Sequence, residues 1–119
     1  MAATIIDVAG FLEVWGDTVP DKVFTNKKDI LKVVVPDRIT VIGDMAFSTC
    51  SRMVELRLPD TLTSIGKKAF IDCSGLVELR LPDTLTAIGD YAFHGCSGLV
   101  ELRLPTTLTA IGDCAFQDC

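Results

Sequence analysis

Apolar and polar residues recur along this chain with a period of 23 residues, and this repeat is the main feature of the sequence. Each repeat places proline, isoleucine with glycine, alanine with phenylalanine, and cysteine at fixed positions. The aligned residues are Pro36/Pro59/Pro82/Pro105, Ile42/Ile65/Ile88/Ile111, Gly43/Gly66/Gly89/Gly112, Ala46/Ala69/Ala92/Ala115, Phe47/Phe70/Phe93/Phe116 and Cys50/Cys73/Cys96/Cys119. One unit of this length cannot bury its apolar side alone, whereas stacked units can. The pattern therefore predicts a solenoid, an architecture suited to binding.

The segment Leu99–Leu104 carries the strand signal of one repeat. Leu102 and Leu104 alternate with Glu101 and Arg103, which is the two-residue period of a strand with one buried face. The proline that follows ends this strand, because proline has no N–H group to donate to a ladder.

The rest of the repeat is predicted to contain a second extended piece and a turn. Leu85–Ile88 is the extended piece and ends at Gly89. A glycine at a fixed position is usually required by a positive φ or by a close approach of another backbone segment. Asp90–Gly95 is predicted to form about one helical turn that directs Ala92 and Phe93 inward. Stacking then aligns equivalent residues about 4.7 to 4.9 Å apart. The predicted core columns are Val33/Leu56/Leu79/Leu102, Val35/Leu58/Leu81/Leu104 and Ile39/Leu62/Leu85/Leu108.

The repeat closely resembles the BspA-like class of leucine-rich repeat. The matching residues are Leu81-Pro82, Thr86-Ala87-Ile88-Gly89, Ala92-Phe93 and Cys96 to Leu99, and the resemblance covers about Val19 to Cys119. It implies a β-rich, right-handed solenoid with a parallel β-sheet and short helical turns. It also implies a role in protein contacts, often in cell-surface and host-interaction proteins, and no catalytic residues.

The repeats divide the chain into a predicted cap and a predicted solenoid. Residues 1–18 are apolar and precede the first recognisable repeat position, so they are expected to cover the open amino end. The solenoid is expected to span residues 19–119, with a degenerate half repeat (19–35), three full repeats (36–58, 59–81 and 82–104) and an incomplete repeat (105–119).

Length and charge narrow the choice of partners. The 119 residues suffice for one domain, and the net charge of −5 disfavours nucleic acid and anionic membrane surfaces as partners. Neither a signal peptide nor a membrane span is visible. This favours the interior of a cell or organelle, while the resemblance keeps the cell surface open.

The cysteines and the single histidine are expected to be structural or inert. The column Cys50/Cys73/Cys96/Cys119 is interpreted as buried thiols, because its linear spacing does not converge on a metal, although adjacent pairing under oxidation stays open. Cys114, at a variable position, is the candidate reactive thiol, and His94 is expected to be a solvated surface residue. No cofactor, metal or catalytic site is predicted.

The outward strand residues are the candidate partner-binding site. They form a striped face with one acidic row, Glu55, Glu78 and Glu101, and one basic row, Arg57, Arg80 and Arg103. Its diagonal Glu–Arg pairs can offset repulsion within each row. The face either keeps the sheet soluble or docks a protein through bidentate arginine contacts. Lys32 and Val34 interrupt both rows, so a docking surface should begin at Glu55.

The last coil is predicted to present an open end with three exposed apolar residues, Leu108, Ile111 and Phe116. An uncovered strand edge is a template for another chain, so a partner subunit, a second copy or a further segment is expected there. The sequence thus favours a non-catalytic interaction or scaffold module. The alternatives are a permanent structural subunit of a larger assembly and a fragment of a cell-surface adhesin.

Overall fold

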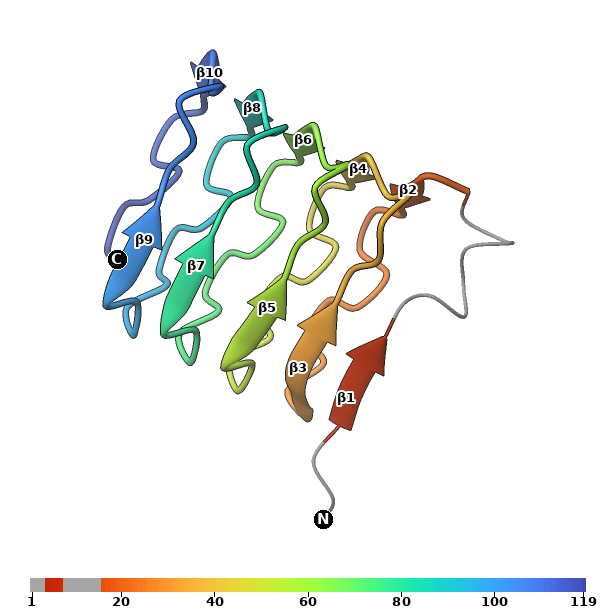
Figure 1. Cartoon of the computed structure of the whole chain (residues 1–119). Helices are drawn as coiled ribbons and strands as arrows, with labels where there is room; N and C mark the ends of the chain where they lie inside the picture. Colours follow the sequence, from red (N-terminus) through yellow and green to blue (C-terminus); the bar gives the residue numbers. More distant parts are fainter. Residues whose placement is uncertain (1–3, 8–15) are drawn as a thin grey trace.

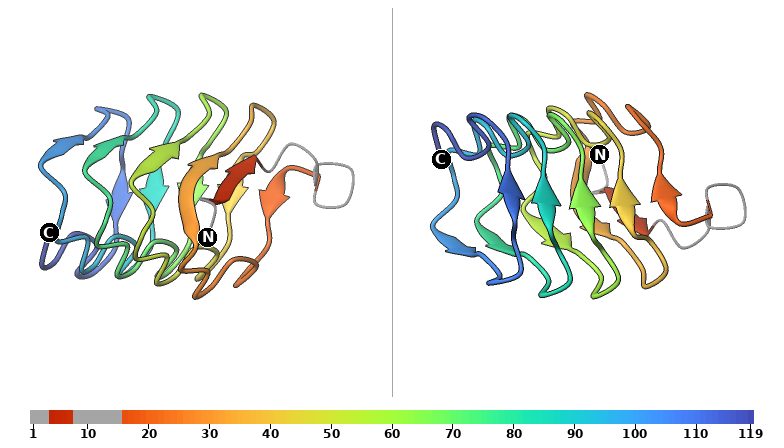
Figure 2. Two further views of the ribbon diagram at one scale, coloured as in Figure 1. Left: turned by 90° about the horizontal axis from the view of Figure 1, so that it is seen from below. Right: turned by 90° about the horizontal axis from the view of Figure 1, so that it is seen from above.

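The computed structural model describes residues 4–7 and 16–119 and shows a solenoid of stacked coils (Figure 1). One set of strands forms the long-strand face: β1 (Thr4–Asp7), β3 (Ile30–Val34), β5 (Glu55–Arg57), β7 (Glu78–Arg80) and β9 (Glu101–Arg103). The other set forms the short-strand sheet: β2 (Thr18–Val19), β4 (Val41–Ile42), β6 (Ser64–Ile65), β8 (Ala87–Ile88) and β10 (Ala110–Ile111). The two sets lie on different sides of the coil (Figure 2). The predicted parallel β-solenoid is confirmed.

Every strand pair is parallel and matches residues 23 positions apart within the repeats. Leu79 lies beside Leu102, and Ile65 beside Ile88. The short-strand sheet runs without a break in the order β10-β8-β6-β4-β2. This register turns each repeat position into a column along the solenoid axis.

The predicted helical turn over Asp90–Gly95 is wrong, and no helix occurs in the described ranges 4–7 and 16–119. The chain instead makes consecutive tight turns, in which the Ala92 N–H donates to the Gly89 carbonyl at 3.2 Å and the Cys96 N–H to the Phe93 carbonyl at 3.2 Å. Tyr91 and Gly95 have φ values of 59° and 76°, which interrupt a right-handed helix. The N–H groups between these turns point along the axis: that of Phe93 donates to Ala115 of the next coil at 2.8 Å.

Gly89 is required by a close approach between coils. A Cβ atom there would lie 2.6 Å from the backbone N of Lys67 and 2.7 Å from the carbonyl carbon of Gly66. The Gly89 N–H also donates to the Ile65 carbonyl at 2.8 Å. Of the two reasons expected for glycine here, the close approach applies.

Phenylalanine rings form the centre of the core. Neighbouring rings are stacked, with Phe47–Phe70 and Phe70–Phe93 centroids 5.2 Å apart. Phe24 and Phe116 extend the stack at its two ends with centroid distances of 5.3 Å. Stacked aromatic pairs add a specific geometry to the burial of apolar area.

The predicted core columns are buried except near the last coil and at Leu58. Leu79, Leu81 and Leu85 are 0%, 6% and 0% exposed, whereas Leu102 and Leu104 are 37% and 48% exposed. Leu58 and Leu108 are half-buried. Leu102 and Leu104 are exposed because no further coil lies against them.

At the amino end, β1 pairs with β3 in parallel, with Ile6 beside Val33. β1 therefore lies beside β3 in the position where the long strand of a preceding coil would lie. Residues 1–3 and 8–15 of the expected cap lie outside the described residues, so the boundary at residue 18 stays a prediction.

Replacing Phe93 with alanine should lower the free energy of unfolding by about 3 to 5 kcal/mol, since Phe93 is fully buried between two rings. Thermal and denaturant unfolding measure the loss. Tyr91→Ala removes an exposed ring from the same coil and serves as the control, with an expected change of about 0.5 kcal/mol. Equal melting of Phe93→Ala and the wild type would remove Phe93 from the core.

Candidate functional site

The long-strand face presents the two charged rows of the striped face. In β7, Leu79 is buried while Glu78 and Arg80 on either side of it are exposed. The register places Glu78 beside Glu101 and Arg80 beside Arg103. The structure therefore brings the predicted residues together as rows along the solenoid axis.

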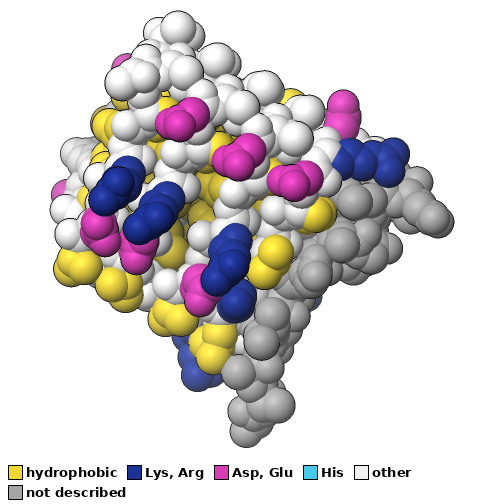
Figure 3. Space-filling view, viewed as in Figure 1, with side chains coloured by type: hydrophobic (Ala, Val, Ile, Leu, Met, Phe, Trp, Pro, Cys, Tyr) yellow, Lys and Arg dark blue, Asp and Glu magenta, His cyan; other side chains and the backbone are white. Residues whose placement is uncertain are grey.

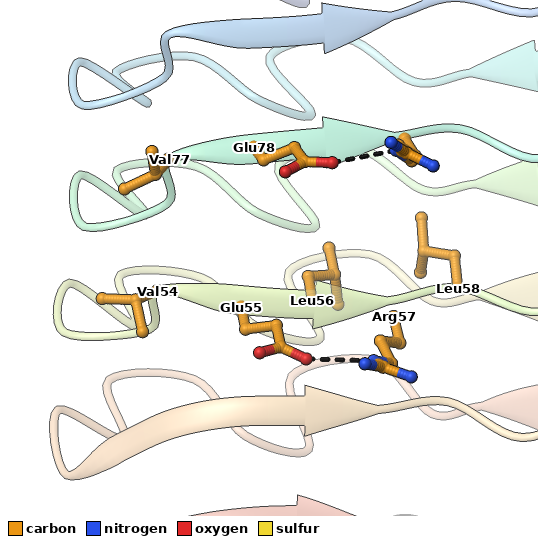
Figure 4. A pocket seen from close by; sticks show the side chains of 8 residues that line it. Val54, Glu55, Leu56, Arg57, Leu58, Val77 and Glu78 are labelled. Carbon is orange, nitrogen blue, oxygen red and sulfur yellow. Dashed lines mark hydrogen bonds and ion pairs between the residues drawn. The ribbon is translucent and has the colours of Figure 1, made fainter.

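The Glu–Arg ion pairs of this face run along each strand, unlike the diagonal pairs expected between strands. The Nε–H of Arg80 donates to Glu78 Oε1 at 2.8 Å, and that of Arg57 to Glu55 Oε2 at 3.0 Å (Figure 4). The equivalent atoms of Arg103 and Glu101 are 4.0 Å apart. Residues two apart on a strand share a face, so their long side chains meet without crossing to the next coil.

Glu55 has a second partner in the preceding coil. Lys32 Nζ lies 3.1 Å from Glu55 Oε2. The hydrogen bond from Arg57, followed by that from Lys32, lowers the pKa of the Glu55 carboxyl group. Glu55 therefore stays ionised to lower pH than an isolated glutamate.

The arginine side chains keep most of their donors available. A guanidinium group has five N–H donors, and the bond within the strand uses the Nε–H. The side chains of Arg57 and Arg80 remain 69% and 67% exposed. They are thus held in position by their own strand and can still bind a carboxylate from outside.

An apolar row borders the charged rows and was missed by the sequence reasoning. Val54, Val77 and Val100 are 51%, 45% and 81% exposed and directly precede the three glutamates. Figure 3 shows acidic and basic side chains side by side on this face, with hydrophobic side chains next to them. The signal in the sequence was the recurrence of valine at one position just before the strand.

The long-strand face is split between β5 and β7. Among the described residues, the backbone ladders join β1, β3 and β5 in one sheet and β7 with β9 in another. A groove of about 660 Å³ lies at the split, lined by Val54, Glu55, Leu56, Arg57, Leu58, Val77, Glu78 and Arg80. Leu56 and Leu58 point from β5 toward β7 in this gap (Figure 4). The groove combines an apolar floor with a charged rim.

The cysteine column is buried in its first three members, but the prediction is wrong for Cys119, which is exposed because no further coil covers it. Cys50, Cys73 and Cys96 are fully buried, and each thiol donates to a phenylalanine carbonyl of the preceding coil at 3.3 to 3.4 Å. Burial raises the pKa of Cys50 to about 11 and that of Cys96 to about 12, and it also raises the pKa of Cys73. All five cysteines are free, and no group that could hold a metal ion occurs among the described residues.

His94 is more enclosed than expected. Its side chain is 25% exposed, its Nε2 lies 3.6 Å from Asp118 Oδ2, and its ring is tilted against Tyr91. The Nδ1 atom is buried and has no hydrogen-bond partner among the described residues. The prediction of a fully solvated histidine is wrong, because neighbouring turns pack against the ring.

The outer side of the last coil is apolar. Ile111 is 51% exposed, whereas its equivalent Ile88, one coil earlier, is 3% exposed. Leu108 and Phe116 are half-buried. Leu102 and Leu104 add to this surface, which has the composition of an interface between coils.

Comparison with known proteins identifies the repeat. The sequence profile of the BspA type leucine rich repeat region matches residues 17–119 in six copies. No curated protein matches the chain. In the described part of the chain, no helix is long and apolar enough to cross a membrane.

Solved structures of bacterial leucine-rich repeat proteins are similar to this chain. A leucine-rich repeat protein of T. pallidum has a TM-score of 0.84 and 34% identity, over 86% of this chain and 48% of its own. A leucine-rich repeat protein of Bacteroides ovatus has a TM-score of 0.79 and 34% identity, over 82% of this chain and 25% of its own. A leucine rich cell surface protein of Faecalibacterium prausnitzii has a TM-score of 0.63 and 25% identity, over 87% of this chain and 40% of its own. This chain thus spans less than half the length of each.

Thiol alkylation of the native chain should modify Cys114 first and spare Cys50, Cys73 and Cys96 until the chain unfolds. Cys114 is exposed, whereas at pH 8 a pKa of about 11 leaves Cys50 roughly a hundredfold less thiolate than an ordinary cysteine. Peptide mapping after timed exposure to iodoacetamide measures each rate. Cys114→Ser is the control and should remove the fastest phase, leaving Cys119, which is exposed but has a pKa raised by partial burial, as the next thiol to react. Rapid labelling of Cys73 in the folded chain would contradict the buried column.

Proposed function

Since the chain belongs to the BspA-type leucine-rich repeat family, we propose that it is a non-catalytic protein-interaction or scaffold module that docks a protein on the striped face. The family and its fold are typically non-catalytic. The partner class is protein, because the net charge of −5 opposes binding to nucleic acid.

The exposed guanidinium groups carry this proposal. Arg57 and Arg80 are ordered by bonds within their strands while two-thirds of each side chain faces solvent. An ordered side chain loses less conformational freedom when it binds, so its contact with a partner is more favourable. The neighbouring groove and the exposed valines add apolar area beside these donors.

A permanent structural subunit is the second candidate function. The exposure of Leu102, Leu104 and Ile111 favours it, because their equivalents one coil earlier are almost fully buried. An apolar surface of this kind is typical of a contact that persists. Under this alternative, a partner subunit, a second copy or a further coil covers the last coil.

A fragment of a cell-surface adhesin is the third candidate. The similarity to a cell surface protein of Faecalibacterium prausnitzii favours it. The upstream part of the gene tests this alternative: a reading frame that continues upstream into an exported leader supports it, and a frame with no such leader contradicts it.

Reversing Arg80 and Arg103 to glutamate should abolish protein binding while leaving the fold intact. Both side chains are about two-thirds exposed, so the change removes donors and adds repulsion without opening the core. Proteins captured on immobilised wild-type and variant chains are compared by mass spectrometry at several salt concentrations. Binding to the wild type should weaken as salt rises.

Lys67→Glu with Lys68→Glu is the matched control for this charge reversal. Both lysines are exposed on a turn away from the striped face. The control should capture the same proteins as the wild type. Identical capture by the Arg80/Arg103 variant would place the interface elsewhere.

A polar capping coil added after Cys119 should raise solubility and suppress association through the end of the solenoid. The added coil would cover Leu102, Leu104, Leu108, Ile111 and Phe116 and would pair with the edge of β9. Light scattering after size-exclusion chromatography measures the change. The amides of Val100 and Glu101 already donate to the Val77 carbonyl, so the test concerns the amides on the open edge of β9. A dilute, stable monomer of the uncapped chain, with these edge amides open to hydrogen exchange, would contradict the need for a cover.

A further inference from the structure

We propose that the striped face binds a second copy of this chain, forming a face-to-face dimer about a two-fold axis parallel to the solenoid axis. This inference rests on the proposed function, because it names the partner of the same face. Its grounds are the order of the rows, the availability of their polar atoms and the apolar rows that border them.

The order of the charged rows selects one symmetry. In a two-fold, face-to-face contact, the axis lies in the contact plane and the same patch is used twice. If the axis runs along the strands, glutamates oppose glutamates and arginines oppose arginines. If it runs along the solenoid over Leu56, Leu79 and Leu102, each acidic row meets the basic row of the other copy.

In the second arrangement, Glu78 lies opposite Arg80 of the other copy, and Arg80 lies opposite its Glu78. The bond within the strand uses one guanidinium N–H and Oε1 of Glu78, so further donors and the second carboxylate oxygen can take part. Each new contact is a charge-assisted hydrogen bond. The existing pair already orders both side chains, which reduces the entropy lost on association.

The apolar rows match under the same rotation. Along β5, Val54 lies two residues before the axis position Leu56, and Leu58 lies two residues after it. The rotation therefore places the exposed row Val54, Val77 and Val100 over the row Leu58, Leu81 and Leu104 of the other copy. Val54 and Val77 are 51% and 45% exposed, whereas Leu58 is half-buried, Leu81 is 6% exposed and Leu104 is 48% exposed, so apolar contact is expected at Leu58 and Leu104. Charged and apolar rows are thus complementary under one operation.

The size of the patch predicts a weak dimer. Five residues at about 3.3 Å span about 17 Å along a strand, and three coils at about 4.8 Å span at least about 14 Å, because the ladder is broken between β5 and β7. Stable complexes bury roughly 800 Å² on each partner, about three times the area of this contact, so the dimer is expected only at high chain concentration. The first coil does not extend the patch, since Lys32 would face Val34 of the other copy and Lys32 is already paired with Glu55.

A charge-swapped variant tests this arrangement without changing composition. Glu78→Arg, Arg80→Glu, Glu101→Arg and Arg103→Glu reverse the two rows in two coils and keep the pairing within each strand. The swapped chain remains complementary to itself. A mixed dimer with the wild type would instead place like charges opposite each other in these coils.

Wild-type and swapped chains carrying different fluorophores are measured singly and mixed at about 1 mM chain and low ionic strength. Each should self-associate to the same extent, and added salt should dissociate both. Mixed dimers should form roughly tenfold less than random pairing predicts, because like charges oppose each other. Circular dichroism melting of both chains verifies that the swap leaves the fold unchanged.

A wild-type chain that stays monomeric, or mixed dimers at the random proportion, would overturn the proposal. Association that strengthens with salt and ignores the swap would also overturn it and would locate the contact at Leu102, Leu104 and Ile111. If the wild type is monomeric but the Arg80/Arg103 reversal abolishes capture of another protein, only the dimer fails. If that reversal changes neither capture nor association, the striped face fails as a docking surface altogether.

Discussion

Hydrogen bonds directed along the solenoid axis are the constraint on which the rest of this structure depends. In the turns, alternate N–H groups donate to the next coil, as Phe70 does to Ala92 at 2.8 Å, while the groups between them close tight turns within their own coil. Buried backbone groups are thereby paired without a helix. Because these bonds join residues one repeat apart, any side chain kept at one position must stack on its own copy. The phenylalanine, cysteine and charged rows all follow from this register.

The same register places like charges side by side, and ion pairs within each strand offset their repulsion. Identical rows bring glutamate beside glutamate and arginine beside arginine, and like charges on neighbouring strands destabilise a sheet. The bonds Arg57–Glu55 and Arg80–Glu78 place an opposite charge next to each member. Each strand is then locally neutral, but the face keeps separate acidic and basic rows. A partner can therefore bind in a defined orientation without meeting a large net charge.

The sequence predicted the features that arise when equal residues of successive repeats stack on each other. It missed the features that depend on the path of the backbone within a single repeat. The period predicted the parallel solenoid and an inward phenylalanine in the coil of Phe93, because both require only that like residues coincide. The turn at Tyr91 was mistaken for a helix, since the first position with positive φ holds residues as different as Lys68, Tyr91 and Cys114 and gives no glycine signal. The split between β5 and β7 was also unpredictable, because Glu55–Arg57 and Glu78–Arg80 have the same residues.

Residues that differ between repeats therefore determine where along the solenoid a partner can bind, which identical repeats cannot do. Lys32 and Val34 end the charged rows at the first coil, so the striped face has a defined beginning at Glu55. At another repeat position, an aspartate side chain accepts a hydrogen bond from the backbone of the next coil: Asp44 accepts from the Lys67 N–H at 2.9 Å, and Asp90 accepts from the Asp113 N–H at 2.7 Å. Lys67 occupies this position in the coil between them and has no carboxylate that could accept such a bond. A uniform array would let a partner slide from one coil to the next with equal energy. Since Lys32 and Val34 break the translational symmetry of the striped face, a partner that contacts them has one preferred position along the solenoid.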